Sequence, residues 1–269
     1  MSRPIIYKKV LSTSKGVQDG DGTIIFQEPM LFSQGSRKYV RLVEASIPSN
    51  MVNICSNYLN NKVQVTLNET ILPIITFPDG IYTTTSLQGA LNSAIASYLV
   101  DVNDPGILIK TNTTLQKVYI QFVSAKFKPL VGVAISSISL NLSISNIYVV
   151  LGYTATTSLT GLNDTFPAPN YAKLDYFGNR AYIDIIGLGT LAIVNNTTST
   201  TIGTINLATD NTTNTYTYPR YGEQPLFYEL GISNMINSYT VKIYGQDGLP
   251  LYFTDGEIYL LWAISEDSK

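Results

Sequence analysis

The sequence predicts an all-β protein, a single jelly-roll β-sandwich with one short helix and an elaborated loop end. Short segments in which apolar and polar residues alternate recur along the chain, and this is the periodicity of strands. Turn residues separate these segments, and only one stretch has the three- and four-residue spacing of an amphipathic helix. Because no repeat and no linker is present, we expect one domain over residues 1–269, with an N-terminal arm over residues 1–16.

The strongest strand signal covers residues 37–47. Its alternation places Val40, Leu42, Glu44 and Ser46 on one face, and Tyr39, Arg41, Val43, Ala45 and Ile47 on the other. Pro48 cannot donate to a ladder, so we expect the strand to end there. A carboxylate is costly to bury alone, and the face of Glu44 should therefore meet water or a cation such as Arg41.

Further strands are predicted in order along the chain. The first, 23–26, should end at Pro29, whereas the segment 62–67 should have 73–77 as its second arm or neighbour. The others are expected at 118–123, 138–145, 148–153, 181–186, 203–208, 239–244 and 257–264. Both faces of the last strand are apolar, which predicts a central position or an intersubunit contact, with Trp262 in the core.

One helix is predicted from the residues that share one helical face: Leu87, Leu91, Ala94, Ile95, Tyr98 and Leu99. Thr84, Thr85 or Ser86 can cap its N-terminus. Outside the strand at 203–208, the region 195–218 consists of Asn and Thr tracts. We expect this region to be an exposed loop or an insertion.

The composition favours a protein whose surface is covered by other proteins. Only 13% of the residues are charged, the net charge is -2, and 19 tyrosines are present. Interface cores are depleted in charge and enriched in tyrosine, and a net charge this small offers no broad cationic field for nucleic acid. The same composition would also arise from AT-rich coding, which favours Asn, Ile, Lys and Tyr. The N-terminal arm is basic, so it is either an ordered or frayed terminus or a contact to an acidic partner or to packaged nucleic acid.

The absence of histidine excludes several kinds of active site. Ser-His-Asp and Cys-His nucleophile arrangements, the common zinc sites and the usual general base at neutral pH all need histidine. The 19 acids leave a carboxylate-dependent glycosidase formally open, but none lies in a recognisable motif. We therefore predict no enzymatic activity, no catalytic residue, no cofactor and no metal.

Two motifs resemble ligand sites but lack what those sites require. Gly187, Gly189 and Ala192 match a dinucleotide-binding motif, but the residues that follow would not sustain a helix, so we expect a strand with a glycine bulge. Asp19 and Asp21 resemble part of a calcium loop without its remaining ligands. With one cysteine and no apolar run long enough for a signal or a membrane span, we expect a soluble protein made in a reducing compartment.

The order of several motifs resembles one family. The carriers are Tyr39–Pro48, Ile75–Asn92, Leu151–Tyr153, Pro225–Leu230 and Val241–Leu251. Together they resemble the penton, or minor capsid, jelly-roll proteins of virophages, polinton-like viruses and related small icosahedral viruses. The resemblance is distributed over most of the chain and fits the region 195–218 only loosely.

The resemblance implies a structural role in a virion. Five copies would close each fivefold vertex, with the chain itself and the major capsid protein as partners, after synthesis in the host cytoplasm. An attachment fibre head or lectin-like module, whose tyrosines bind glycan, is the alternative. Neither membrane insertion nor sequence-specific nucleic-acid binding is expected. The candidate interface residues are Arg3, Lys8, Lys9, Arg41, Glu44, Tyr216, Tyr218 and Tyr221.

Overall fold

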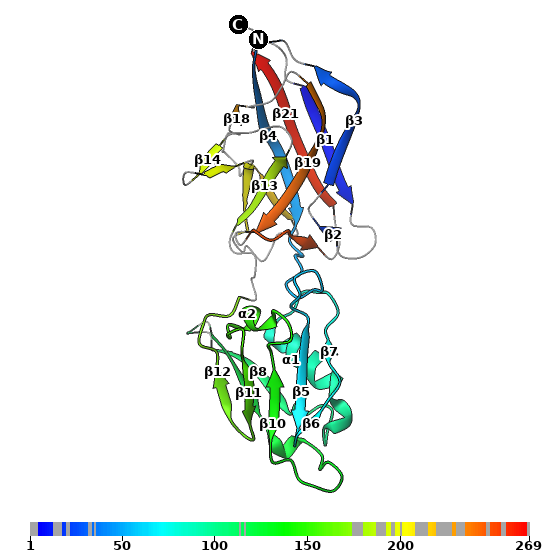
Figure 1. Ribbon diagram of the computed structural model, residues 1–269, viewed down its shortest axis with the longest axis vertical. Helices are drawn as coiled ribbons and strands as arrows, with labels where there is room; N and C mark the ends of the chain where they lie inside the picture. The colour runs from blue at the N-terminus through cyan, green and yellow to red at the C-terminus, as the bar shows by residue number, and fades with distance from the viewer. Residues whose placement is uncertain are drawn as a thin grey trace. The chain divides into compact units, whose positions relative to one another are not determined.

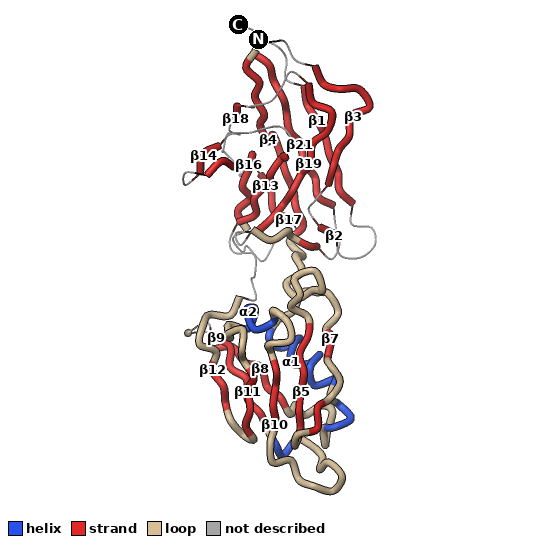
Figure 2. Tube along the Cα trace, in the orientation of Figure 1, coloured by secondary structure: helices blue, strands red, loops and turns tan. Residues whose placement is uncertain are grey.

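The computed structural model is dominated by β-strands (Figures 1 and 2). It describes residues 5–12, 18–19, 22–31, 34, 36–112, 114–115, 117–173, 180–186, 192–194, 197–199, 201–207, 215–218, 228–229, 235–245, 248–253 and 257–267. The chain divides into two compact units, a terminal unit of residues 1–51 and 177–269 and an inserted unit of residues 52–176. Within the described residues, the helices are too short and too polar to cross a bilayer.

The terminal unit contains two larger antiparallel sheets. Sheet A has the order β1-β21-β4-β17, with β18 also paired to β4, and sheet B has the order β16-β13-β19-β3. The bounds in sheet A are β1 Ile5–Ser12, β4 Arg37–Pro48, β17 Thr215–Tyr218, β18 Tyr228–Glu229 and β21 Glu257–Asp267. Those in sheet B are β3 Gly22–Leu31, β13 Arg180–Ile186, β16 Thr201–Asn206 and β19 Met235–Gly245. Two short pairs join β2 (Gln18–Asp19) to β20 (Tyr252–Phe253), and β14 (Ala192–Val194) to β15 (Thr197–Ser199).

Sheets A and B pack face to face around one core. Leu42 and Trp262 of sheet A and Ile243 of sheet B are fully or almost fully buried. A Cβ added at Gly203 of β16 would lie 2.4 Å from Cδ2 of Leu42, so the two layers meet closely at this glycine. The predicted all-β sandwich class is confirmed, and so is the core position of Trp262.

A bulge in β4 changes which residues face the core. Leu261 of β21 lies opposite Glu44 and Trp262 lies opposite Leu42, so Val43 is the extra residue. Val40 and Leu42 are buried before the bulge, whereas Ala45 and Ile47 are buried after it. The uniform alternation expected over 37–47 is therefore wrong. Glu44 meets water, as predicted, because the bulge turns it away from the core.

The N-terminal segment is a strand and not a free arm. All eight residues of β1 pair with β21, which places β21 between β1 and β4. Strand β21 therefore lies centrally in the sheet, as predicted, but Tyr259 and Leu261 on its outer face are only half-buried, so the expected cover of both faces is incomplete among the described residues. Strand β3 also runs through Pro29, where the sequence predicted a stop. It is an edge strand whose register shifts between Ile25 and Met30, and an edge or bulge is where proline is tolerated.

Much of the region 195–218 is strand. Its described parts contribute β15, β16 and β17, and Ile202 and Ile205 of β16 are fully buried. Strand β16 confirms the strand predicted over 203–208, shifted by two residues, whereas β15 and β17 are strands where a loop was expected. The long insertion in the chain is instead residues 52–176.

The inserted unit has its own core between two antiparallel sheets and a helix. Sheet C has the order β11-β10-β5-β6, with β7 also paired to β5, and sheet D has the order β12-β9-β8. The bounds in sheet C are β5 Lys62–Leu67, β6 Thr70–Ile71, β7 Ile75–Thr76, β10 Ile138–Asn141 and β11 Ser158–Gly161. Those in sheet D are β8 Ile107–Asn112, β9 Lys117–Phe122 and β12 Thr165–Pro167. The helices are α1 Thr84–Ala94, α2 Ile147–Leu151 and the 3-10 turns η1 Ala96–Tyr98 and η2 Ser124–Lys126.

Helix α1 confirms the predicted helix, but its cap lies one residue earlier and it ends at Ala94, so that Tyr98 belongs to the 3-10 turn η1 and Leu99 follows it. Thr83 is the N-cap, and it exchanges hydrogen bonds with Ser86 in a capping box. The inward face packs Leu87 and Leu91 into the core. The side chain of Gln88 accepts a hydrogen bond from the Ile109 backbone N–H at 2.8 Å, so the helix also satisfies part of the edge of β8.

The segment 148–153, predicted as a strand, begins in helix α2. A short apolar run fits a buried helix as well as a strand, and Gly152 decides between them. It ends the helix with φ +81°, and an added Cβ would lie 2.5 Å from the Asn170 carbonyl oxygen. Strand β10 is also shorter than predicted, since it ends at Asn141 although Leu142 is buried.

The prediction of a single jelly-roll domain over residues 1–269 is not decided by the division into two compact units. The two compact units do not decide whether they unfold together, and the prediction therefore stays open.

Candidate assembly surface

Sheet A brings together most of the residues predicted to form an interface. Lys8 and Lys9 lie on β1, Arg41 and Glu44 on β4, and Tyr216 and Tyr218 on β17. Arg3 and Tyr221 lie outside the described residues. The strand order places these three distant segments in one sheet. Glu44 is exposed, whereas Lys9, Tyr216 and Tyr218 lie opposite Leu260, Ile47 and Ala45, which are buried.

The ladder registers define one cross-strand row on sheet A. Lys8 of β1 lies opposite Leu261 of β21, and Leu261 lies opposite Glu44 of β4. Directly opposite residues of an antiparallel sheet share a face. Glu44 is exposed and Leu261 is half-buried, so these two residues lie on the outer face of the sheet.

The tyrosines predicted to lie in loops are strand residues. Tyr216 lies opposite Ile47, and Tyr218 lies opposite Ala45, in the antiparallel pairing of β17 with β4. The loop placement of these two residues is therefore wrong. Sheet A ends at β1 on one side among the strands that the structure describes, so β1 offers an unpaired edge there.

A tyrosine cluster on sheet B was missed by sequence reasoning. The rings of Tyr182 and Tyr244, which lie opposite each other on β13 and β19, stack with centroids 5.5 Å apart. The Tyr244 hydroxyl donates to Oδ1 of Asp184 at 2.9 Å and also lies 3.0 Å from the Thr201 hydroxyl. The alternation of residues 182 and 184 could have suggested a shared face, but the partner strand was needed to identify the pair.

The Tyr244 cluster predicts a loss of stability in alkali. Burial raises the pKa of Tyr244 from 10.0 to about 12, while the Thr201 hydrogen bond opposes the rise and the Asp184 charge adds to it. Between these pH values the unfolded chain loses a phenol proton that the folded chain keeps, so stability falls as pH rises. Denaturation midpoints measured from pH 10 to 12 should fall less steeply in Tyr244→Phe. An unchanged slope would contradict this assignment.

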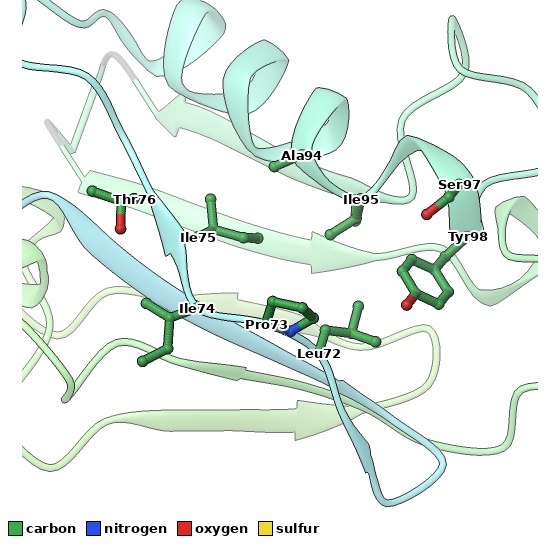
Figure 3. Close-up of a pocket in the computed structure, with 9 residues that line it drawn as sticks. All are labelled: Leu72, Pro73, Ile74, Ile75, Thr76, Ala94, Ile95, Ser97 and Tyr98. Atoms are coloured by element: carbon green, nitrogen blue, oxygen red, sulfur yellow. The ribbon is translucent and has the colours of Figure 1, made fainter.

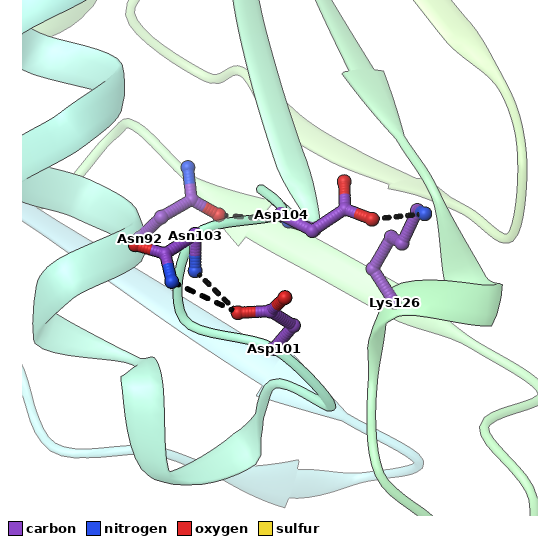
Figure 4. A network of polar contacts seen from close by, with 6 residues as sticks. Asn92, Asp101, Asn103, Asp104 and Lys126 are labelled. Carbon is purple, nitrogen blue, oxygen red and sulfur yellow. Dashed lines mark hydrogen bonds and ion pairs between the residues drawn. The ribbon is translucent and has the colours of Figure 1, made fainter.

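The titratable groups of the inserted unit serve structural roles. Asp101 accepts hydrogen bonds from the backbone and side chain of Asn103, and Asp104 pairs with Lys126 (Figure 4). Burial raises the pKa of the Cys55 thiol, so this cysteine is not an activated nucleophile. In the described part of the chain, no group of three or more Cys, Asp or Glu side chains is placed to hold a metal ion.

The dinucleotide-like motif is only partly visible. Ile183 and the residues up to Ile186 belong to β13, whereas Gly187 to Leu191 lie outside the described residues. The predicted glycine bulge at this position therefore stays a prediction. Asp21 of the calcium-loop-like fragment also lies outside the described residues, so the expectation that it binds no calcium stays a prediction as well.

The chain was compared with known proteins at three levels. No protein-family model matches it, and no curated protein matches it. Among solved structures it is similar to the mavirus penton protein, with a TM-score of 0.43 and 12% identity over 99% of this chain and 100% of that one. It is also similar to a chain of the Sputnik virophage solved by cryo-EM, with a TM-score of 0.43 and 11% identity over 98% of both chains.

Proposed function

We propose that this chain is a non-enzymatic viral structural protein, a penton that closes the fivefold vertices of an icosahedral capsid. It is made in the host cytoplasm, assembles as a homopentamer in the virion and contacts the major capsid protein. The observation that carries the proposal is the outer face of sheet A, where the exposed Glu44 lies beside the half-buried Tyr259 and Leu261, on a chain whose motif order resembles penton proteins.

The chemistry of sheet A suits a contact between copies. Its outer face combines a carboxylate at Glu44 with half-buried apolar and aromatic residues such as Leu261 and Tyr259. A ring requires two different patches that meet head to tail, and the edge at β1 and the outer face are two such patches. A specific contact of this kind buries on the order of 800 Å² on each partner.

Charge reversal at Glu44 tests the proposed surface. Glu44→Lys should lower incorporation into particles about tenfold, because a mismatched charge in an interface costs at least the 1.4 kcal/mol that a tenfold change requires. Quantitative mass spectrometry of purified particles measures the copy number. Glu69→Lys, an equal change at an exposed position of the inserted unit, is the control.

Two outcomes would remove the proposal. One is equal incorporation of the Glu44 and Glu69 variants, and the other is a cryo-EM map of particles without this chain at the fivefold vertices. Mass photometry of the purified chain over a range of concentrations measures self-association independently of the particle.

The glycan-binding alternative has less support. It rested on loop tyrosines, but Tyr216 and Tyr218 belong to β17 and pair with β4. Binding to a glycan array that disappears in Tyr216→Ala and Tyr218→Ala variants would restore it.

A further inference from the structure

The inserted unit carries an apolar groove of about 400 Å³ (Figure 3). One wall is the chain segment Leu72–Thr76, and the other is the end of α1 with Ala94 and Ile95, followed by Ser97 and Tyr98 of η1. The Tyr98 ring points toward Leu72 and Pro73 in the close-up. This volume lies within the range of ligand pockets in proteins, and none of the lining side chains is charged.

The segment wall of the groove is an edge of sheet C. Residues 70–77 run antiparallel to β5, with the Leu72 N–H bonded to the Val65 carbonyl and the Phe77 N–H bonded to the Asn61 carbonyl. Between these bonds Pro73 has no N–H, and within the described residues the Ile74 backbone makes no hydrogen bond. The Ile74 side chain is 54% exposed. The edge therefore offers unused backbone groups beside an apolar surface.

The edge at Ile74 differs from the edge of β8 in the same unit. At β8, the amide side chains of Gln88 and Asn92 bond to the backbone of Ile107 and Ile109 and so occupy the edge. Helix α1 thus closes one sheet edge, whereas at its C-terminal end a groove separates it from the other edge. A partner strand that enters the groove would give the edge at Ile74 the hydrogen bonds that Gln88 and Asn92 already give the edge of β8.

Two exposed lysines give the groove a positive rim. Lys128 lies at the α1 end, where its Nζ is 3.2 Å from the Ser97 carbonyl oxygen and its N–H bonds to the Tyr98 carbonyl. Lys62 lies directly opposite Thr76 in the β5–β7 ladder. The nearby carboxylate of Asp101 already accepts two hydrogen bonds from Asn103. The charge pattern selects an occupant that is apolar in its middle and acidic at its ends.

We propose that this groove binds an extended, acidic-flanked apolar segment of a partner protein by strand addition. The segment pairs with the backbone at Ile74, inserts alternate apolar side chains between Leu72 and Ala94, and places its acidic residues near Lys62 and Lys128. The inference uses only the inserted unit and does not rest on the proposed penton role.

A synthetic peptide provides the probe. Fluorescein-labelled, N-acetylated Glu-Val-Ile-Val-Glu amide is titrated with the full chain and followed by fluorescence polarisation. Ala94→Trp fills the groove and should weaken binding at least about tenfold, which corresponds to the loss of about 1.4 kcal/mol. Ser93→Trp is the matched control, because Ser93 is the exposed neighbour on α1 that does not line the groove. Hydrogen exchange of the Ile74 amide should slow when the peptide binds.

Several results would overturn the proposal. One is the absence of saturable binding at concentrations up to about 1 mM, which is the weakest dissociation constant expected of such a groove. Another is equal binding of the peptide by the two tryptophan variants. A peptide with lysines in place of the glutamates should bind more weakly, and equal binding would remove the charge argument. Unchanged exchange at Ile74 would exclude strand addition. Self-association of the chain that Ala94→Trp abolishes would identify a second copy as the occupant in place of a different partner.

Discussion

Replacing Asn92 with leucine should destabilise the inserted unit by about 4 kcal/mol, because it leaves several buried backbone groups without partners. The Asn92 side chain accepts from the N–H groups of Gly106 and Ile107 at 2.9 and 3.1 Å and donates to the Ile107 carbonyl at 2.7 Å. Figure 4 shows this side chain beside the loop that follows α1. Leucine has a similar size, so the loss measures hydrogen bonding and not packing.

The measurement uses the sole tryptophan as an internal reference. Near-UV circular dichroism in a urea titration reports the tyrosines of both units, whereas fluorescence reports Trp262, which lies in the terminal unit. Ser93→Leu places the same side chain at the next, exposed helix position and should change stability by less than about 0.5 kcal/mol. Equal effects of the two variants would contradict the role of Asn92. If the Trp262 transition shifts with Asn92→Leu, the chain unfolds as one cooperative domain.

Replacing Gly152 with alanine should cost the inserted unit about 3 kcal/mol, from backbone strain together with a steric clash. Gly152 has φ +81°, a conformation that side chains disfavour. An alanine Cβ would also lie 2.5 Å from the Asn170 carbonyl oxygen and 2.9 Å from that of Tyr171. These are backbone atoms, so they cannot rotate away as the end of a side chain could.

Gly89 is the matched control for Gly152. It lies within α1, and an added Cβ would meet no atom within 4 Å. Gly89→Ala should therefore stabilise the unit by about 0.5 to 1 kcal/mol, because alanine favours the helix and restricts the unfolded chain. The test is the difference between the two urea midpoints. A Gly152→Ala protein at least as stable as the parent would refute the strain argument.

Local patterns predicted those elements whose side chains face one core without interruption. Strand β5 was placed to the residue because Val63 and Val65 keep the period of a strand. The spacing of Leu87 and Leu91 predicted helix α1, but the pattern extended it to Leu99, beyond its end at Ala94. In each case the periodicity is a direct consequence of burial.

The predictions failed where a distant contact changes a local preference. Nothing near Val43 in sequence indicates the β4 bulge, which exists because β21 pairs in two registers around it. Residues 148–153 are apolar enough for either structure, and the loop at Asn170 and Tyr171 packs against the glycine that ends the helix. The loop prediction for the region around β17 failed because a sequence rich in Asn and Thr favours a loop locally, whereas the pairing with the distant strand β4 makes it a strand.

The candidate surface follows the same division. The sequence alone determined that the chain has no histidine, little charge and many tyrosines, and these properties are set by composition whatever the fold. Only the tertiary structure decided that Lys8, Glu44 and Tyr218 lie on one sheet, because their strands are far apart in the chain. The groove beside Ile74 was likewise beyond sequence reasoning. A sheet edge becomes available or closed through the helix that packs against it, and that packing is a property of the fold and not of any local segment.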